Sequence, residues 1–481
     1  MKDEDKESKV VGGARNRRVT ALMLRATVAG ALLLLSLLAW WLQRSEMPWN
    51  WLEIGRVELV ALCVSKTDQW QVAACVGLYF GGFLYLGHLL KGEQAFWKNP
   101  RSMAVAFFAI CAVVAYGREY PGSTSGNDFL VLLVGLTAGQ AAGFWRLWER
   151  RDGRDDFAAR AFLISFVLLV AGLSWLEMEA GSVEYQYRGR QRWQGLWDTP
   201  NVYGVLMAMG FVASVGLLLR AVGSGRGEPK VKCFLQAVRV SLCLVAMTMT
   251  GTGLIHSYSR GAWLGAACGL LLLVRHWLKR PANDRTASPV LVFTRNTFPY
   301  WLLIGASLWV MGFWTLRHTE MPLVRRVFTV ANPYDFSWRN RVAVVPGSLQ
   351  MIGERPLVGW GWGKPTAAYE RVYKPAHLTE GAAVTLNDYL MLGMTLGIPG
   401  LWAFLFWLWM IFRRNDAEEG GFVAKAFSVT TICRAASLPG LIGMIFDGVL
   451  FRMAIAVPMF VLLELGSAGF GPRRVEPTER A

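Results

Sequence analysis

Long apolar stretches constrain this chain more than any other feature, because each one is long enough to cross a bilayer. A membrane-spanning helix needs about 20 mostly apolar residues to cross roughly 30 Å of hydrocarbon. Hydrophobic residues make up 54% of the sequence and gather into about twelve such stretches. The sequence therefore predicts an all-α polytopic membrane protein with about twelve transmembrane helices. The predicted spans are 20–42, 71–90, 102–117, 128–147, 158–175, 201–220, 233–254, 261–278, 297–316, 388–411, 425–446 and 449–466.

Basic residues in the connecting segments predict the orientation. If the N-terminus is inside, the inner segments hold 29 Lys and Arg residues and the short outer segments hold 8. Cytoplasmic loops of membrane proteins carry such an excess. The pattern predicts that both termini are cytoplasmic, and it accounts for most of the net charge of +16. Nucleic-acid binding is not indicated, because no basic stripe interleaved with aromatic residues lies outside the inner loops.

The chain divides into four predicted regions. Residues 1–19 are charged and are expected to form a disordered cytoplasmic N-terminus, without a cleavage site before the first span. Residues 20–466 form a single transmembrane domain, and residues 467–481 form a cytoplasmic tail. The long polar segment 317–384, between spans 9 and 10, is predicted to be a large periplasmic loop.

Several chemistries find no support in the sequence. The seven cysteines are scattered singly, and none forms a Cys-x-x-Cys pair. This gives neither a disulfide framework nor a zinc signature. The loops contain no phosphate-binding Gly-x-x-x-x-Gly-Lys motif and no dinucleotide-binding motif. We therefore predict no metal and no cofactor.

Polar motifs follow one another in the second half of the chain, and a Pro200-Asn201 pair precedes them. They are Ser259-Arg260-Gly261 between two spans, Asn340-Arg341 before the Glu354–Gly363 run, and Asn387-Asp388-Tyr389-Leu390 at the start of the tenth span. In this order they resemble the O-antigen ligase and O-antigen polymerase superfamily of bacterial inner-membrane proteins. The resemblance covers about residues 195–465.

The resemblance implies a fold, a reaction and a location. Members of the superfamily are helical bundles similar to GT-C glycosyltransferases, with a large periplasmic loop. They move a glycan from undecaprenyl diphosphate to a glycan, lipid or protein acceptor at the periplasmic face of the inner membrane. The implied products include lipopolysaccharide and exopolysaccharide. Ligase and polymerase share these motifs, and oligomeric state stays open.

Arginines are the candidates for binding the donor. Departure of undecaprenyl diphosphate builds negative charge, and a guanidinium grips phosphate oxygens in bidentate fashion without losing its proton. Arg260 lies at the outer end of an apolar hairpin, and Arg341 matches the family arginine before the glycine-rich run. Arg339 is close enough in sequence to take the place of Arg341. The alternatives are that Arg260 reaches toward the interface and that the loop arginines only solvate a surface.

The run from Gly359 to Gly363 is the candidate for contacting the glycan. Trp360 and Trp362 offer rings that stack on a pyranose, and Gly359 and Gly361 allow the backbone to approach a ligand. Asn387 completes this predicted group. A purely structural turn is an equal alternative, and tryptophans are common at membrane interfaces.

The acceptor side departs from the family pattern. Related enzymes generally carry a histidine directly before the Asn of the Asn-Asp-Tyr-Leu motif, where this chain has Leu386. A general base must reach the acceptor hydroxyl. His377, Asp388 and Glu380 are the candidates to replace the histidine.

Charged and helix-breaking residues at the spans give three further expectations. Asp447 and Arg452 fall near the last outer turn and are functional candidates, and the alternative is that they simply pair with each other. Arg434 lies in an apolar stretch and is expected to pair within the bundle or to line a groove for the carrier lipid. Gly397 beside Pro399 is expected to break the tenth span near its outer end.

The sequence therefore predicts an inner-membrane glycosyltransferase that uses undecaprenyl diphosphate. The alternatives are a membrane transporter and a non-catalytic member of a polysaccharide-export complex. Transporters often contain paired broken helices in two repeated halves. The chain has one strong break and no obvious internal repeat.

Overall fold

The structure is a computed structural model, and it describes ten segments of the chain. These are residues 100–116, 126–151, 157–180, 186–187, 190–197, 199–223, 230–278, 336–375, 387–413 and 428–467. All of them belong to one compact unit, Leu52–Ala481. The predicted spans 20–42, 71–90 and 297–316 lie outside the described residues, as do both termini.

The described residues are almost entirely helical, as predicted. The first six long helices are α4 (Pro100–Tyr116), α5 (Gly126–Arg151), α6 (Phe157–Ala180), α7 (Pro200–Gly223), α8 (Lys230–His256) and α9 (Arg260–Leu278). The later elements are α12 (Phe336–Glu354), α13 (Lys364–Ala368), the π-helix η3 (Tyr369–Tyr373), α14 (Asp388–Arg413), α15 (Val429–Phe446) and α16 (Met453–Gly466). Strands β1 (Gln186–Tyr187) and β2 (Arg190–Gln191) form a small antiparallel hairpin in which Gln186 pairs with Gln191.

Six of these helices have the length and hydropathy of membrane spans, namely α5, α6, α7, α8, α14 and α15. The shorter helices α4 and α16 are also apolar. The fold is thus that of a multi-pass helical membrane protein. Nine described helices coincide with predicted spans, whereas the total of twelve stays a prediction.

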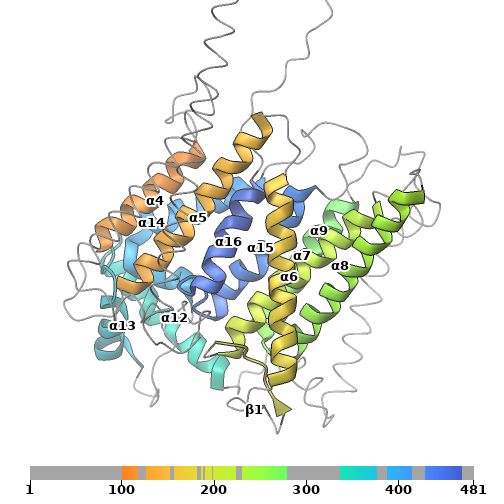
Figure 1. Cartoon of the computed structure of the whole chain (residues 1–481). Helices are drawn as coiled ribbons and strands as arrows, with labels where there is room; N and C mark the ends of the chain where they lie inside the picture. Colours follow the sequence, from red (N-terminus) through yellow and green to blue (C-terminus); the bar gives the residue numbers. More distant parts are fainter. Residues whose placement is uncertain are drawn as a thin grey trace, which may run out of the picture. The chain divides into compact units, whose positions relative to one another are not determined.

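Small residues let the helices pack closely. Gly135, Gly139 and Gly143 recur every fourth residue along α5 and face α16, where a Cβ at Gly139 would lie 2.9 Å from the Phe460 carbonyl oxygen. On α9, a Cβ at Gly265 would lie 2.7 Å from the Cα of Pro439 on α15. Such contacts are typical of helix pairs in membranes, where close backbone packing replaces the hydrophobic effect. Figure 1 shows α16 and α15 beside each other within the bundle.

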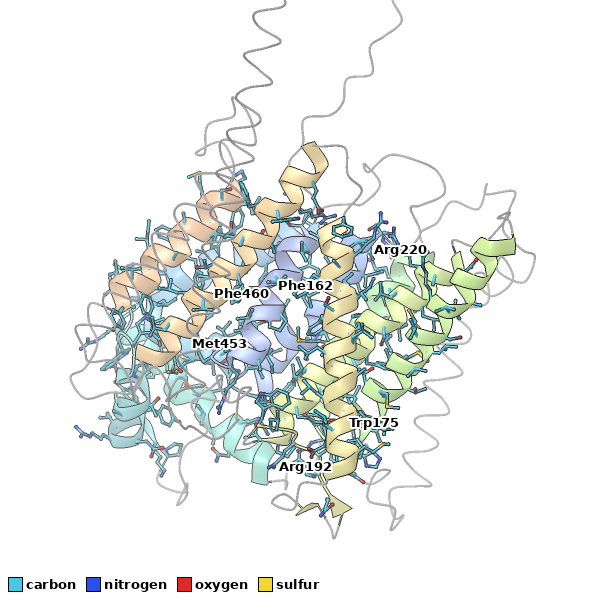
Figure 2. The ribbon with its side chains drawn as sticks, viewed as in Figure 1. Phe162, Trp175, Arg192, Arg220, Met453 and Phe460 are labelled. Carbon is cyan, nitrogen blue, oxygen red and sulfur yellow. The ribbon has the colours of Figure 1, made fainter. Side chains whose placement is uncertain are left out.

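One end of the bundle carries the polar segment that the sequence predicted as a large loop. Its described part, residues 336–375, is mostly helical and is called the lid below. Val344, Met351 and Ile352 of α12 pack on Met391 and Met394 of α14. The end of the bundle on which the lid lies is called the lid end. Figure 2 shows Arg192 and Trp175 at the lid end and Arg220 at the opposite end.

The expected break of α14 is confirmed. Gly397 has φ 77° and ψ 179°, and Pro399 follows two residues later. Proline removes a backbone hydrogen bond and clashes with the preceding turn. The break lies in the half of α14 that is nearer the lid end.

Candidate functional site at the lid end of the bundle

The turn between α8 and α9 positions Arg260. Tyr258 adopts a left-handed conformation with φ 50°, and Ser259 Oγ accepts a hydrogen bond of 3.4 Å from Ala262 N. A serine in this position caps the first turn of a helix. The chain therefore reverses within three residues, and Arg260 becomes the first residue of α9. The turn packs on α7, since a Cβ at Gly204 would lie 2.6 Å from Ser257 Oγ.

Arg341 of the lid binds the turn that follows α15. Its Nε donates a hydrogen bond of 2.7 Å to the Phe446 carbonyl oxygen, and its Nη2 lies 3.0 Å from Asp447 Oδ1. The interpretation that Asp447 simply pairs with Arg452 is wrong, because the Asp447 carboxylate pairs with Arg341. Arg452 instead begins α16 as its N-cap residue. The pairing holds the lid on the helical bundle.

A chain of hydrogen bonds extends this ion pair across the lid end. Asn201 Nδ2 donates to Asp447 Oδ1 at 2.8 Å, and Arg192 Nη2 donates to Asn201 Oδ1 at 3.0 Å. Arg192 Nε also donates to the Ser257 carbonyl oxygen at 3.0 Å. The network thus joins the lid, the turn after α15, the start of α7 and the turn before Arg260.

Phe446 brings the two predicted arginines to one place. Gly261 lies against it, with a would-be Cβ 3.3 Å from the Phe446 Cβ. Arg341 bonds to the carbonyl oxygen of the same residue. Phe446 therefore contacts both Arg341 and the residue that follows Arg260, although the two arginines are 81 positions apart in sequence.

Asp447 supplies the negative charge at the centre of the network. Burial raises the pKa of its carboxyl group from 3.8 to about 6, although Arg341 and the hydrogen bond from Asn201 act in the opposite direction. A buried carboxylate is costly unless it is paired and hydrogen-bonded. The ionised form of Asp447 is consequently sustained by the groups it holds in place.

Asp388 is fully enclosed at the start of α14. Its Oδ2 accepts a hydrogen bond of 2.8 Å from Leu450 N, and within the described part of the chain its Oδ1 has no hydrogen-bond partner. The side chain has 0% of its surface exposed, so Oδ1 is the carboxylate oxygen without a hydrogen bond but is itself enclosed. Asn387 accepts a hydrogen bond from Leu390 N at 3.0 Å and thereby caps α14.

The glycine-rich run forms a strap, residues 355–363, across the break in α14. Trp360 N donates to the Met394 carbonyl oxygen at 2.8 Å, and Gly361 N donates to that of Thr395 at 3.1 Å. In return, Ile398 N donates to the Pro356 carbonyl oxygen at 2.7 Å. A broken helix leaves such groups without partners, and lipid offers none. The strap restores the backbone hydrogen bonds that the break removes.

Gly359 is required for this approach. It has φ 61°, and a Cβ there would lie 2.3 Å from the Thr395 carbonyl oxygen. No side chain fits at that distance. The close contact between the strap and α14 is therefore sufficient to explain why position 359 is a glycine, as the alternative of a purely structural turn predicted.

The two candidate tryptophans differ in exposure. Trp362 is 0% exposed, and its indole N–H donates to the Ala112 carbonyl oxygen of α4 at 3.0 Å. Both faces of Trp362 are thus within the core. Trp360 is half-buried, donates from its indole to the Met351 carbonyl oxygen at 2.9 Å, and has the Arg355 guanidinium 4.2 Å from its ring centroid. Trp360 is the better placed of the two for a ligand.

The structure does not describe the side chains of three predicted site residues. His377 and Glu380 lie outside the described residues, and Arg339 is described only through its backbone in the first turn of α12. Among the described residues, no three His, Cys, Asp or Glu side chains gather in a way that would hold a metal ion. The identity of the general base therefore stays a prediction.

Sequence reasoning did not single out Arg192 as part of the site. The signal was present, because Arg192 is one of three arginines in the short outer segment 177–200. Basic residues in such segments run against the positive-inside rule. Asn201 was noted as part of a motif, but its bonds to Asp447 and Arg192 come from the structure alone.

These features define a helical membrane protein whose lid end gathers arginines from distant parts of the chain. Residues 242–405 match the family model described as O-antigen ligase, and this match supports the resemblance to the O-antigen ligase superfamily. The match runs from α8 into α14 and contains Arg260, Arg341, the strap and Asn387. A search of curated proteins found no match to the chain.

Proposed function

We propose that the protein transfers a glycan from undecaprenyl diphosphate to an acceptor at the periplasmic face of the bacterial inner membrane, as an O-antigen ligase or polymerase does. The family match supports glycosyl transfer in polysaccharide biosynthesis. The observation that carries the proposal is that Phe446 contacts both Arg341 and Gly261, the residue after Arg260, at the end of the bundle where the lid lies.

The two arginines would hold the diphosphate of the donor. In the reaction, the acceptor oxygen forms a bond to C1 of the sugar while the bond from C1 to the diphosphate oxygen breaks. The leaving undecaprenyl diphosphate keeps the electron pair, and a base takes the proton of the acceptor hydroxyl. Fixed guanidinium groups stabilise the charge that develops on the leaving group. No metal is part of the proposal.

Asp447 would act as a positioning residue. It is bonded to Arg341 at 3.0 Å and to Asn201 at 2.8 Å, and both bonds reach its Oδ1. A carboxylate bonded to a guanidinium fixes the orientation in which the guanidinium would meet a phosphate. The base that takes the proton of the acceptor hydroxyl would be His377, Glu380 or Asp388. Measuring transfer after single substitution of each residue identifies which of the three it is.

Alanine replacement of Arg260 and of Arg341 tests the proposal. We expect each variant to lose transfer by at least about a hundredfold, since removal of one group that stabilises a transition-state anion typically has this effect. Lysine replacements should recover only part of the activity, because an ammonium group cannot bind phosphate oxygens as a planar fork. Transfer is measured with purified protein and a glycan-loaded carrier, and in cells as the surface-glycan ladder.

Arg371→Ala is the matched control. Arg371 is an exposed arginine of the lid, away from Asp447, and its removal should leave transfer unchanged. Normal ladders in both the Arg260→Ala and Arg341→Ala variants, at normal protein level, would refute the assignment.

A further inference from the structure

The turn between α15 and α16, residues 447–452, is contacted by three parts of the protein. The lid reaches it through the ion pair of Arg341 with Asp447, in which Nη2 and Oδ1 lie 3.0 Å apart. The strap reaches it through Trp362, whose ring meets the ring of Phe451 edge-on with the centroids 5.8 Å apart. The first residue of α14 makes the third contact. The turn is therefore the place at which the lid, the strap and α14 meet.

Asp388 is the residue of α14 that holds this turn. Its Oδ2 accepts a hydrogen bond of 2.8 Å from Leu450 N. Leu450 is fully buried, and a buried N–H that loses its partner is costly. The next residue of α14, Tyr389, donates from its hydroxyl to the Leu441 carbonyl oxygen of α15 at 3.0 Å. The start of α14 thus fixes both the second half of α15 and the turn that follows it.

Backbone hydrogen bonds connect Leu450 to Asp447 within the turn. Asp447 N donates to the Gly443 carbonyl oxygen at 2.8 Å, which ties the turn to the end of α15. Val449 N, adjacent to Leu450, donates to the Asp447 carbonyl oxygen at 2.8 Å. Asp447 and Leu450 therefore belong to one hydrogen-bonded unit. A shift of Leu450 would move the carboxylate that orients Arg341.

The same burial separates Asp388 from an acceptor. A general base must come within hydrogen-bonding distance of the hydroxyl whose proton it takes. Asp388 has no exposed surface, and its Oδ2 already accepts the hydrogen bond from Leu450 N. Its Oδ1 has no hydrogen-bond partner among the described residues, but it is enclosed. The carboxyl group is thus built into the turn rather than open to a substrate.

We infer that Asp388 is a positioning residue, which holds the turn 447–452 so that Asp447 orients Arg341 toward the diphosphate of the donor. Asp388 is accordingly not the base that takes the proton of the acceptor hydroxyl. The inference rests on the proposed function, because it takes Arg341 to bind the donor. Leu450 N requires an acceptor oxygen at position 388, and this oxygen need not carry a charge.

Two replacements of Asp388 separate positioning from proton transfer. Asp388→Asn keeps an oxygen that accepts the hydrogen bond from Leu450 N, but its amide does not act as a base. We expect this variant to keep transfer within about threefold of the wild type, since an amide oxygen is also an acceptor. Asp388→Ala removes the acceptor and should lower transfer at least about tenfold, because Leu450 N is left without a partner. Transfer is measured per folded molecule with purified full-length protein and a glycan-loaded carrier.

Ser348→Ala is the matched control for loss of a buried polar group at the lid end. Ser348 lies on α12, is fully buried, and its Oγ has no hydrogen-bond partner among the described residues. Its replacement leaves no donor without an acceptor. Transfer in this variant should therefore equal that of the wild type.

A double variant tests whether Asp388 acts through Asp447. In the Asp447→Asn background, adding Asp388→Ala should lower transfer less than about twofold further, since residues that act as one unit are not additive. A base at position 388 would instead lower transfer by another factor of about a hundred. A general loss of stability would not produce this difference, because transfer is expressed per folded molecule.

Three outcomes would overturn the inference. Equal losses of transfer in Asp388→Asn and Asp388→Ala would show that the carboxyl group itself is needed. Wild-type transfer in Asp388→Ala would show that the bond to Leu450 does not matter, and a further large loss in the double variant would show that Asp388 acts independently of Asp447. If Asp388→Ala is absent from the membrane, Asp388→Asn decides: retained transfer supports the inference, and a loss of about a hundredfold overturns it.

The arginine variants keep this inference distinct from the proposed function. Transfer that survives both Arg341→Ala and Arg260→Ala would refute the proposed function, whatever the Asp388 variants show. Transfer that depends on both arginines, with equal losses in the two Asp388 variants, would refute the positioning role alone.

Discussion

Both ends of the helical bundle contain hydrogen-bonded arginines, but these are buried at the end opposite the lid and partly exposed at the lid end. At the end opposite the lid, Arg146 Nη1 donates to the carbonyl oxygens of Leu465 and Ser467, and its Nη2 donates to Thr430 Oγ1 at 2.6 Å. Arg434 Nε donates to the Gly466 carbonyl oxygen at 2.6 Å. These arginines cap the C-terminus of α16, where the helix dipole favours positive charge.

Glu464 completes the network at that end. It forms an ion pair with Arg101 of α4 and accepts a hydrogen bond of 2.7 Å from Gln140 of α5. Four helices are joined in this way, and the side chains face one another or the backbone. The expectation that Arg434 pairs within the bundle is confirmed, while nothing assigns it a role in binding a carrier lipid.

The lid end contrasts with this self-contained arrangement. Arg341 is partly exposed, with 19% of its side chain accessible, and its contacts with the bundle include the Asp447 carboxylate and the Phe446 carbonyl oxygen. Asp388, at the start of α14, keeps one buried oxygen without a partner among the described residues. Arginine thus serves packing at the end opposite the lid, whereas the proposed function gives the partly exposed arginines at the lid end a role in binding the donor.

Removal of Arg146 should have the largest effect on folding. We expect Arg146→Ala to destabilise the protein by about 3–5 kcal/mol, the usual cost of removing one partner from a buried charged network. The protein level in membranes should fall, while transfer per folded molecule stays normal. Arg275→Ala, at an exposed position in the last turn of α9, is the control. A normal level of the Arg146 variant would mean that this end is not structural.

Replacement of Asp447 should show the opposite behaviour. Asp447→Asn keeps the shape of the side chain but removes the charge that fixes Arg341. We expect about a hundredfold loss of transfer, equivalent to about 2.7 kcal/mol of transition-state stabilisation, with a near-normal protein level. Transfer is measured with purified protein at saturating donor. Full activity of this variant would remove Asp447 from the site and with it the contrast between the two ends.

A substitution in the strap should have a smaller effect on stability than the removal of Arg146. Gly359→Ala forces a Cβ against the Thr395 carbonyl oxygen, and we expect a loss of about 1–3 kcal/mol, as is typical of overpacking. Gly353→Ala is the control, because a Cβ at Gly353 would meet nothing within 4 Å. Protease sensitivity of the lid reports the difference. Equal sensitivity of the two variants would contradict the close approach of the strap to α14.

A dependence on pH should be the smallest effect. Burial raises the pKa of Asp447 to about 6, so the carboxyl group is protonated below that pH and its ion pair with Arg341 is lost. Transfer should therefore fall about tenfold per pH unit below about pH 6. The proton stabilises the folded state, because the folded pKa exceeds the unfolded one. This contribution is full below about pH 4 and is lost as the pH rises through about 6.

The Asp447→Asn variant tests whether Asp447 is the group whose titration causes the loss of transfer at low pH. The variant has no carboxyl group at position 447, and its low transfer rate should not vary further between pH 5 and pH 7. A decline with the wild-type midpoint in this variant would assign the titration to another group.

Much of the helical architecture was predictable from the sequence. Apolar runs of the length of α7 or α15 have few alternatives in lipid, because only a helix satisfies its backbone hydrogen bonds internally. Gly397 and Pro399 likewise predicted the break in α14, since both residues act on the local backbone. The partner that repairs the break was not predictable, because Trp360 and Gly361 are more than 30 residues away.

The sequence by itself determined the class of fold, the family resemblance and the residue types available for binding an anion. Hydropathy and backbone chemistry act over short stretches of chain, so their consequences follow from local sequence. Only the tertiary structure decided that Asp447 pairs with Arg341 rather than Arg452, that Trp362 is enclosed, and that Phe446 contacts both Gly261 and Arg341. Ion pairs and ring contacts require specific distances between remote residues, and those distances are set by how the helices pack.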